Sequence, residues 1–142
     1  MNKKKLTVYV VVADYYKDIT NSLTNAAVNY LKKNNYNYEI IKVPGVYEIP
    51  QFINWNLNSK KTNLFIALGC VIKGDTYHFE VISDAVGQSL LDISLSNSKT
   101  IITNGIINAY TGAQAKKRSK ADSKNKGYEA ASAMVRMIEC LT

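Results

Sequence analysis

The residues best suited to chemistry gather in one stretch, Leu64 to Glu80, which reads LFIALGCVIKGDTYHFE. Gly69 and Gly74 are spaced as in a phosphate-binding P-loop, and Asp75 follows them. A P-loop needs lysine at that position to reach the outer phosphates of a nucleotide, so a nucleoside triphosphate is not expected. Two interpretations stay open at this point. The glycine turn seats a single phosphate at a helix N-terminus, or it is a plain structural turn.

His78 is the single histidine of the chain and stands at the start of a helical pattern. An imidazole titrates near neutral pH and suits proton transfer, although a lone histidine in such a place is more often a surface or capping residue. The sequence contains no second histidine and no cluster of Cys and Asp with the spacing of metal ligands. We therefore expect no metal site.

Four further side chains have both a chemical and a structural interpretation. Tyr15 and Tyr47 could stack on a planar heterocycle, or they could simply anchor loops. Glu48 could accept hydrogen bonds from a polyol, or it could favour a helix N-terminus. Arg118, one of two arginines, could clamp a phosphate with two hydrogen bonds, or it could be a solvated charge.

The elements that must position these residues alternate along the chain. Apolar runs predict strands, and apolar residues at helical spacing predict helices. Strands are expected at 6–13, 36–43, 64–68 and 99–107, and helices from Ile19 to about Asn34 and at 48–58, 78–96, 112–120 and 126–141. This alternation predicts one α/β domain over residues 1–142, a three-layer sandwich in which helices cover both faces of a four-stranded parallel sheet.

Ligands of such sheets gather at the carboxyl ends of the strands. Four segments are expected there: 14–16, 44–48, 71–78 and 104–108. All four segments are therefore candidates for ligand contacts.

Composition excludes several classes of protein. Hydrophobic residues make up 46% of the 142, which excludes a disordered chain, and no run approaches the about 18 apolar residues of a membrane span. The apolar run after Lys3–Lys5 lacks a cleavage site of small residues, so we interpret it as the first strand. Cys70 and Cys140 are expected to be free, buried thiols in a reducing cytoplasm.

The net charge of +7 is local, because the basic excess lies in Lys3–Lys5 and between Lys116 and Lys126. Such a cluster could serve nucleic acid, an acidic partner or a small phosphate ligand, and most often it is a solvated helix face. No nucleic-acid recognition motif accompanies it, so an RNA-binding module is the weakest of these alternatives.

The motifs together resemble the lumazine synthase family. Val43–Pro50 reads VPGVYEIP and is similar to the family pattern VPG(A/S)(F/W/Y)EIP. Ala67–Glu80, ALGCVIKGDTYHFE, is similar to LG-x-VI(R/K)G-x-T-x-HF(D/E) and is the more specific match. Asn104–Ile107, Gln114-Ala115, Arg118 and Asn125–Gly127 follow in the family's order and spacing, so the resemblance covers nearly the whole chain.

The resemblance implies a flavodoxin-like fold and a transferase of riboflavin biosynthesis that needs no cofactor or metal. Its reaction condenses 5-amino-6-(D-ribitylamino)uracil with 3,4-dihydroxy-2-butanone 4-phosphate to 6,7-dimethyl-8-ribityllumazine, releasing phosphate and water. The alternative is a non-catalytic lumazine- or flavin-binding protein of the same fold. His78, Glu48 and Arg118 argue against that alternative, because a pure binder needs neither a proton shuttle nor a phosphate clamp.

The resemblance also implies a role for each site residue. His78 would shuttle protons, and Tyr15 would stack on the pyrimidine ring. Other substrate contacts would come from Val46, Tyr47, Glu48, Val71, Ile72, Asn104 and Lys126. The phosphate would be held by Gly74, Asp75, Thr76 and Arg118, with Arg118 supplied by a neighbouring subunit.

Some positions depart from the family pattern. Tyr15 stands where Phe or Trp is usual, and Asn104 stands where many members place an aromatic residue. The segment 119–124, SKADSK, lacks the glycine-rich turn of capsid-forming members. We therefore expect a homopentamer with sites at subunit interfaces rather than a closed shell. It would be cytoplasmic and bind neither nucleic acid nor membrane, with a riboflavin synthase as a candidate partner.

Overall fold

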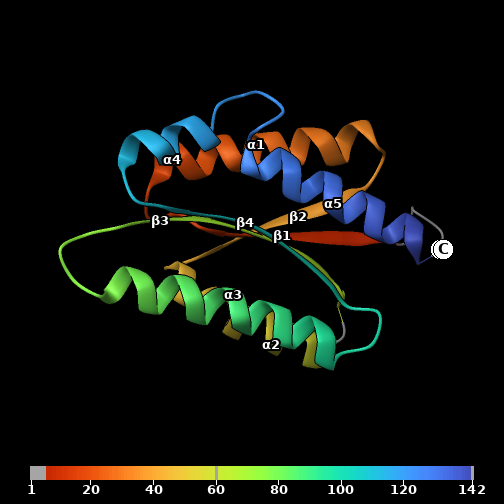
Figure 1. The fold of residues 1–142 in the computed structure, drawn as a ribbon. Helices are drawn as coiled ribbons and strands as arrows, with labels where there is room; N and C mark the ends of the chain where they lie inside the picture. The colour runs from red at the N-terminus through yellow and green to blue at the C-terminus, as the bar shows by residue number, and fades with distance from the viewer. Residues whose placement is uncertain (1–5, 60, 142) are drawn as a thin grey trace.

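A computed structural model describes residues 6–59 and 61–141, so Lys3–Lys5 lie outside the described residues. Its centre is a four-stranded, fully parallel sheet in the order β2-β1-β3-β4 (Figure 1). The strands are β1 (Thr7–Ala13), β2 (Asn37–Val43), β3 (Leu64–Ile72) and β4 (Ile101–Ala109). The predicted four-stranded parallel sheet is confirmed, and the observed strand order is consistent with the predicted flavodoxin-like fold.

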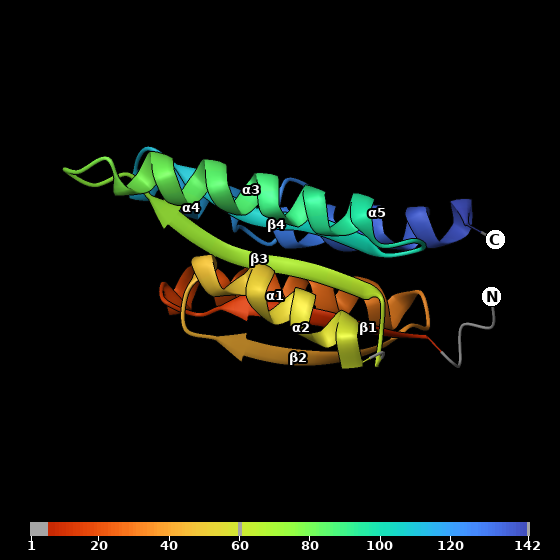
Figure 2. The same cartoon turned by 90° about the horizontal axis from the view of Figure 1, so that it is seen from below.

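Five α-helices cover the two faces of the sheet and complete the predicted three layers. They are α1 (Lys17–Lys33), α2 (Ile49–Ser59), α3 (His78–Ser96), α4 (Gly112–Arg118) and α5 (Lys126–Cys140). Helices α1, α4 and α5 lie on one face, and α2 and α3 lie on the other (Figure 1). Figure 2 views the second face, with β3 visible between α2 and α3.

Each face of the sheet buries its own apolar cluster. Under α1 and α5, Leu23, Leu31 and Met134 pack on the side chains of β1 and β3 such as Ile66. Under α2 and α3, Ile49, Ile53 and Val86 pack on the opposite side chains such as Phe65. Because both faces of β1 and β3 are covered, these two central strands read as continuous apolar runs in the sequence.

Two predicted strand ends are wrong. β3 continues to Ile72 rather than stopping at Leu68, and β4 runs from Ile101 to Ala109. The two strands stay paired without interruption from Leu64↔Ile101 to Ile72↔Ala109. Gly69 is therefore a strand residue and not part of a phosphate turn. Its lack of a side chain serves packing instead, because a β-carbon there would lie 2.7 Å from Val46 Cγ2.

The same register corrects the fourth predicted strand end. Asn104 lies within β4 opposite Ala67, so the segment 104–108 is not a loop at the carboxyl edge. The smaller differences lie at helix ends, where a short 3-10 turn (Val46–Glu48) precedes α2. Cys140 is exposed rather than buried, although both cysteines are free as expected. Within the described part of the chain, no helix is long and apolar enough to cross a membrane.

Candidate active site

A pocket of about 700 Å³ opens at the carboxyl ends of β1, β2 and β3. These ends lie on the same side of the sheet as the loop that leads into α3 (Figures 1 and 2). Of the residues singled out in the sequence, the pocket brings together seven: Tyr15, Val46, Tyr47, Glu48, Val71, Ile72 and His78. Three loops that are distant in sequence thus meet in one place because parallel strands all end at the same edge.

Tyr15 follows β1 and presents its ring to the pocket with 77% of its surface exposed. The ring of Tyr16 stands edge-on to it, with centroids 5.0 Å apart and planes at 85°. Tyr16 itself is held against the core under α1. Burial raises the pKa of the Tyr16 hydroxyl, with smaller contributions from Cys70 and Tyr15. The fixed Tyr16 leaves one face of an exposed aromatic ring available for stacking.

The turn Val46–Glu48 follows β2 and forms the opposite wall. Its backbone is closed by the Glu48 N–H, which donates to the Gly45 carbonyl oxygen at 3.1 Å. Val46 is buried against Gly69, while the half-buried Glu48 folds its carboxylate back over Gly45. A β-carbon at Gly45 would lie 3.1 Å from Glu48 Oε2, so a side chain there would displace the carboxylate. The turn offers one apolar and one hydrogen-bond-accepting group side by side.

The end of β3 forms the floor of the pocket. Val71 and Ile72 are half-buried, and the buried Cys70 also lines the cavity. Burial raises the pKa of the Cys70 thiol to about 11. The thiol is therefore protonated at neutral pH and serves as a small apolar surface rather than as a nucleophile.

His78 begins α3 at the rim of the pocket, and its side chain is exposed. Among residues 6–59 and 61–141, no side chain is hydrogen bonded to it. Its imidazole is therefore free to form hydrogen bonds with a bound molecule, as a proton-transfer group must.

The predicted phosphate-binding residues are not among those that line this pocket. Gly74, Asp75 and Thr76 occupy the exposed loop between β3 and α3. Arg118 is the last residue of α4, on the face of the sheet that α1 and α5 also cover, and it is not among the residues that line the pocket.

Two predicted substrate contacts also lie elsewhere. Asn104 sits on β4, an edge strand, where its Oδ1 accepts the Ile106 N–H at 3.0 Å. Lys126 opens α5, and its ammonium group lies 3.5 Å from Glu129 Oε2. Neither residue lines the pocket of its own chain. In an assembly of several copies, each could instead reach the pocket of a neighbouring chain.

Four pocket residues were missed in the sequence: Tyr16, Gly45, Cys70 and Ile82. The first three adjoin predicted residues, so adjacency alone was the available signal. Ile82 follows His78 by one helical turn, which places both on one side of α3. In the described residues, no group of three or more His, Cys, Asp or Glu side chains is placed to hold a metal ion.

Comparison with known proteins agrees with these motifs. The model of the family "6,7-dimethyl-8-ribityllumazine synthase" matches residues 5–142. A protein of that name from Bartonella henselae is 40% identical over 137 residues, which cover 95% of this chain and 88% of that protein. Another relative of the same name, from Afipia carboxidovorans, is 41% identical over 136 residues, which cover 92% of this chain and 83% of that protein.

Proposed function

Because the chain belongs to the 6,7-dimethyl-8-ribityllumazine synthase family, we propose that the pocket at the ends of β1, β2 and β3 is its active site. The protein is a transferase of riboflavin biosynthesis. It condenses 5-amino-6-(D-ribitylamino)uracil with 3,4-dihydroxy-2-butanone 4-phosphate to 6,7-dimethyl-8-ribityllumazine, releasing phosphate and water. The observation that supports this assignment most is that both specific motifs, VPGVYEIP and ALGCVIKGDTYHFE, contribute residues to one pocket.

In this proposal the pyrimidine ring stacks on Tyr15. The turn Val46–Glu48 binds the uracil edge and the ribityl chain, with the Glu48 carboxylate as a hydrogen-bond acceptor. Val71 and Ile72 contact the heterocycle from β3. The mouth of the pocket then admits the second substrate beside His78.

The chemistry asks little of the protein beyond positioning and proton transfer. The amine of the pyrimidine attacks the ketone and water leaves, the phosphate is eliminated, and ring closure with loss of water completes the product. His78 accepts and returns the protons of these steps. We propose no cofactor and no metal for this sequence, because no step transfers electrons to an external acceptor. Holding two substrates together supplies most of the rate, about 7 kcal/mol or more in well-oriented systems.

The phosphate site is proposed to be completed by a second copy of the chain. Gly74, Asp75 and Thr76 seat the phosphate, and Arg118 of a neighbour, with its Asn104 and Lys126 nearby, closes the site. Two observations support this. Arg118, at the end of α4, does not line the pocket of its own chain. The outer side of α3 also exposes Val81, Leu91 and Leu95, which suit burial between copies. We propose a homopentamer.

We further infer that residues 1–142 form one domain, as the family match over 5–142 supports. The protein is proposed to act in the cytoplasm, where a riboflavin synthase would consume its product.

The assay that tests the function follows lumazine absorbance after both substrates are added to purified protein. We expect product well above the uncatalysed rate. A protein that binds the product but forms none would instead be the non-catalytic binding protein. Steeply salt-dependent binding of oligonucleotides, without turnover, would favour an RNA-binding role for the basic segment.

A further inference from the structure

The loop between β3 and α3 is closed by an ion pair that the proposed reaction does not use. Lys73 precedes the loop, and its Nζ lies 3.6 Å from Oε1 of Glu80, in the first turn of α3. The same Nζ lies 5.7 Å from the ring centroid of Tyr110, within the range of a cation–π contact. Lys73 and Glu80 thus join the two ends of the loop directly.

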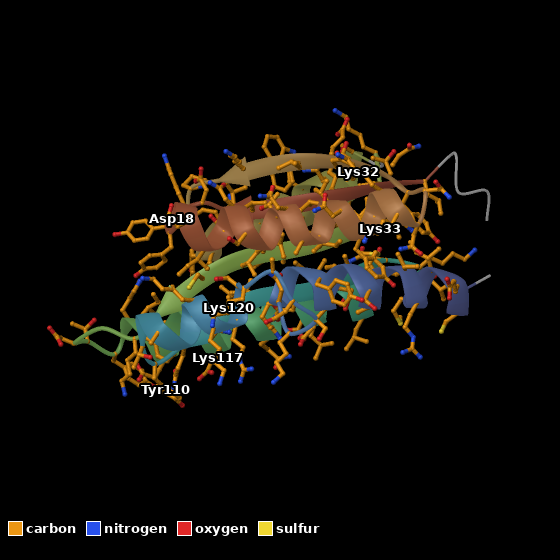
Figure 3. All side chains as sticks on the ribbon, turned by 90° about the horizontal axis from the view of Figure 1, so that it is seen from above. Asp18, Lys32, Lys33, Tyr110, Lys117 and Lys120 are labelled. Carbon is orange, nitrogen blue, oxygen red and sulfur yellow. The ribbon has the colours of Figure 1, made fainter. Side chains whose placement is uncertain are left out.

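Tyr110, the aromatic partner of Lys73, directly follows the end of β4. Its ring centroid is 5.9 Å from that of Phe79, the residue beside Glu80. Its backbone is fixed by the start of α4, because the Tyr110 N–H donates to Gln114 Oε1 at 2.9 Å. Figure 3 labels Tyr110 at the end of the molecule where α4 begins. The Tyr110 ring, although 66% exposed, thus contacts both Lys73 and Phe79, the residue beside Glu80.

The loop has few other attachments. At its start the Lys73 N–H donates to the Ala109 carbonyl oxygen at 2.9 Å, and at its end Tyr77 accepts from the Val81 N–H at 3.2 Å. Gly74, Asp75 and Thr76 are exposed and form no hydrogen bond with any described residue. The conformation of this segment thus depends on how its two ends are held together.

The partial burial of the Glu80 carboxylate also favours its ion pair with Lys73. Its second oxygen, Oε2, is buried and has no hydrogen-bond partner among the residues described. A carboxylate that is partly withdrawn from water is costly unless a positive charge compensates it. Loss of Lys73 would leave Glu80 without its ion-pair partner, and the side chain would be expected to turn outward and release the loop.

We propose that Lys73, Glu80 and Tyr110 form a clasp that holds the loop Gly74–Tyr77 in the shape that receives the phosphate of the second substrate. They are positioning residues and touch no substrate. The proposal rests on the proposed function of Gly74, Asp75 and Thr76. Its physical basis is that a loop ordered before binding costs less free energy to order during binding.

Kinetics with each substrate test the clasp. Lys73→Met should raise KM for the butanone phosphate about threefold to fivefold, the range expected for one partly exposed ion pair, with less than a twofold change for the pyrimidine. Lys73→Arg keeps the charge and should restore most of the loss. At the aromatic partner of Lys73, Tyr110→Leu should resemble Lys73→Met, whereas Tyr110→Phe keeps the ring and should resemble wild type. The control is Lys32→Met, which removes a matched contact between Lys32 Nζ and the Tyr38 ring, 5.9 Å to the centroid, in the last turn of α1.

Amide hydrogen exchange tests the clasp without turnover. In the unliganded protein, Lys73→Met and Tyr110→Leu should speed exchange of the Val81 N–H, which is hydrogen bonded to the Tyr77 carbonyl oxygen at the end of the loop, and Lys32→Met should not. Unchanged exchange in Lys73→Met, or equal KM changes for both substrates, would overturn the clasp. A wild-type protein that forms no lumazine would overturn the proposed function alone, because the exchange measurement would still decide whether the clasp holds the loop.

Discussion

At the scale of single residues, His78 is the side chain whose role depends most on chemistry rather than packing. It is exposed at the pocket rim, and none of the described residues engages its imidazole in a hydrogen bond. Its replacement should therefore leave the fold intact and remove only proton transfer.

We expect His78→Ala to lower kcat by about 10² to 10⁴, the usual contribution of a positioned acid–base group, with little change in pyrimidine binding. Stopped-flow absorbance gives the rate, and calorimetric titration with the pyrimidine gives the affinity. His78→Gln is a matched variant that keeps a hydrogen-bonding side chain. An unchanged kcat in either variant would remove His78 from the mechanism.

The raised pKa of the Cys70 thiol predicts how the stability of the protein changes with pH. Its thiol has an ordinary pKa of 9.0 when unfolded, and burial raises the pKa to about 11 in the folded protein. Because the folded pKa is the higher one, the stabilising contribution of the protonated thiol is complete below pH 9. It is lost as the pH rises through 11, since the unfolded thiol ionises first.

Between pH 9 and 11, wild type should lose about 2 kcal/mol of stability that Cys70→Ala does not lose. Urea unfolding at several pH values measures the difference between the two proteins. The pKa values of Tyr9, Tyr16 and Tyr36 are also raised, first by burial. The effects of Tyr9 and Tyr36 should cancel in this difference, whereas Cys70→Ala also removes the smaller contribution of Cys70 to the pKa of Tyr16. Parallel pH profiles for the two proteins would mean that the Cys70 thiol is not shielded from water.

At the scale of elements, α1 and α5 pack closely against each other at Gly127. A β-carbon at Gly127 would collide with the backbone carbonyl of Leu23. Gly127 does not have a positive φ angle, so the close approach of the two helices, and not the backbone conformation, is what requires glycine there. At Gly87, within α3, a β-carbon would have no atom within 4 Å beyond its own helical backbone and its two chain neighbours.

Alanine should therefore have opposite effects at these two helical glycines. We expect Gly127→Ala to destabilise the protein by about 1–3 kcal/mol through overpacking. Gly87→Ala should stabilise it by about 0.5–1 kcal/mol, because alanine restricts the unfolded chain and favours the helix. Chemical denaturation at one protein concentration compares them. Equal effects at both sites would show that α1 and α5 can separate without cost.

At the scale of the whole molecule, the net charge of +7 is unevenly placed. Figure 3 shows Lys117 and Lys120 beside α4, while Lys32 and Lys33 lie at the far end of α1. A phosphorylated substrate should be drawn to the α4 end if these charges guide its approach.

Replacing Lys117 and Lys120 together by serine should lower kcat/KM for the butanone phosphate about twofold to fivefold at low salt. The effect should vanish near 0.5 M salt, because the attraction between charges is then screened beyond a distance of about one side-chain length. Replacing Lys32 and Lys33 changes the net charge equally and should have less effect. Equal losses for both pairs would indicate a response to total charge alone.

The proposed shared site makes a second prediction at this scale. Chains carrying His78→Ala and chains carrying Arg118→Ala should each be nearly inactive. If Arg118 serves a neighbour's pocket, unfolding and refolding the two together should restore about a quarter of the sites, since random mixing gives that fraction both intact residues. Mixing that restores nothing would place Arg118 and His78 in the same chain's site.

Local pattern determined much of this protein. Apolar runs and helical spacing predicted every strand and α-helix, and strand–helix alternation predicted the parallel sheet. Parallel strands share one carboxyl edge, so the sequence also predicted that Tyr15, Glu48 and His78 would lie at that edge. These results follow from interactions between near neighbours in the chain, which composition and periodicity encode directly.

The tertiary structure decided what depends on register and on close approach. Gly69 resembled a turn residue, yet it continues β3 because pairing with β4 extends to Ile72 and Val46 fills the space beside it. That same pairing brings Tyr110 to Lys73 across more than thirty residues of sequence. Arg118 likewise does not line the pocket of its own chain. Such contacts form only when separate elements pack together. The local sequence of one segment does not specify which distant side chain will lie beside it.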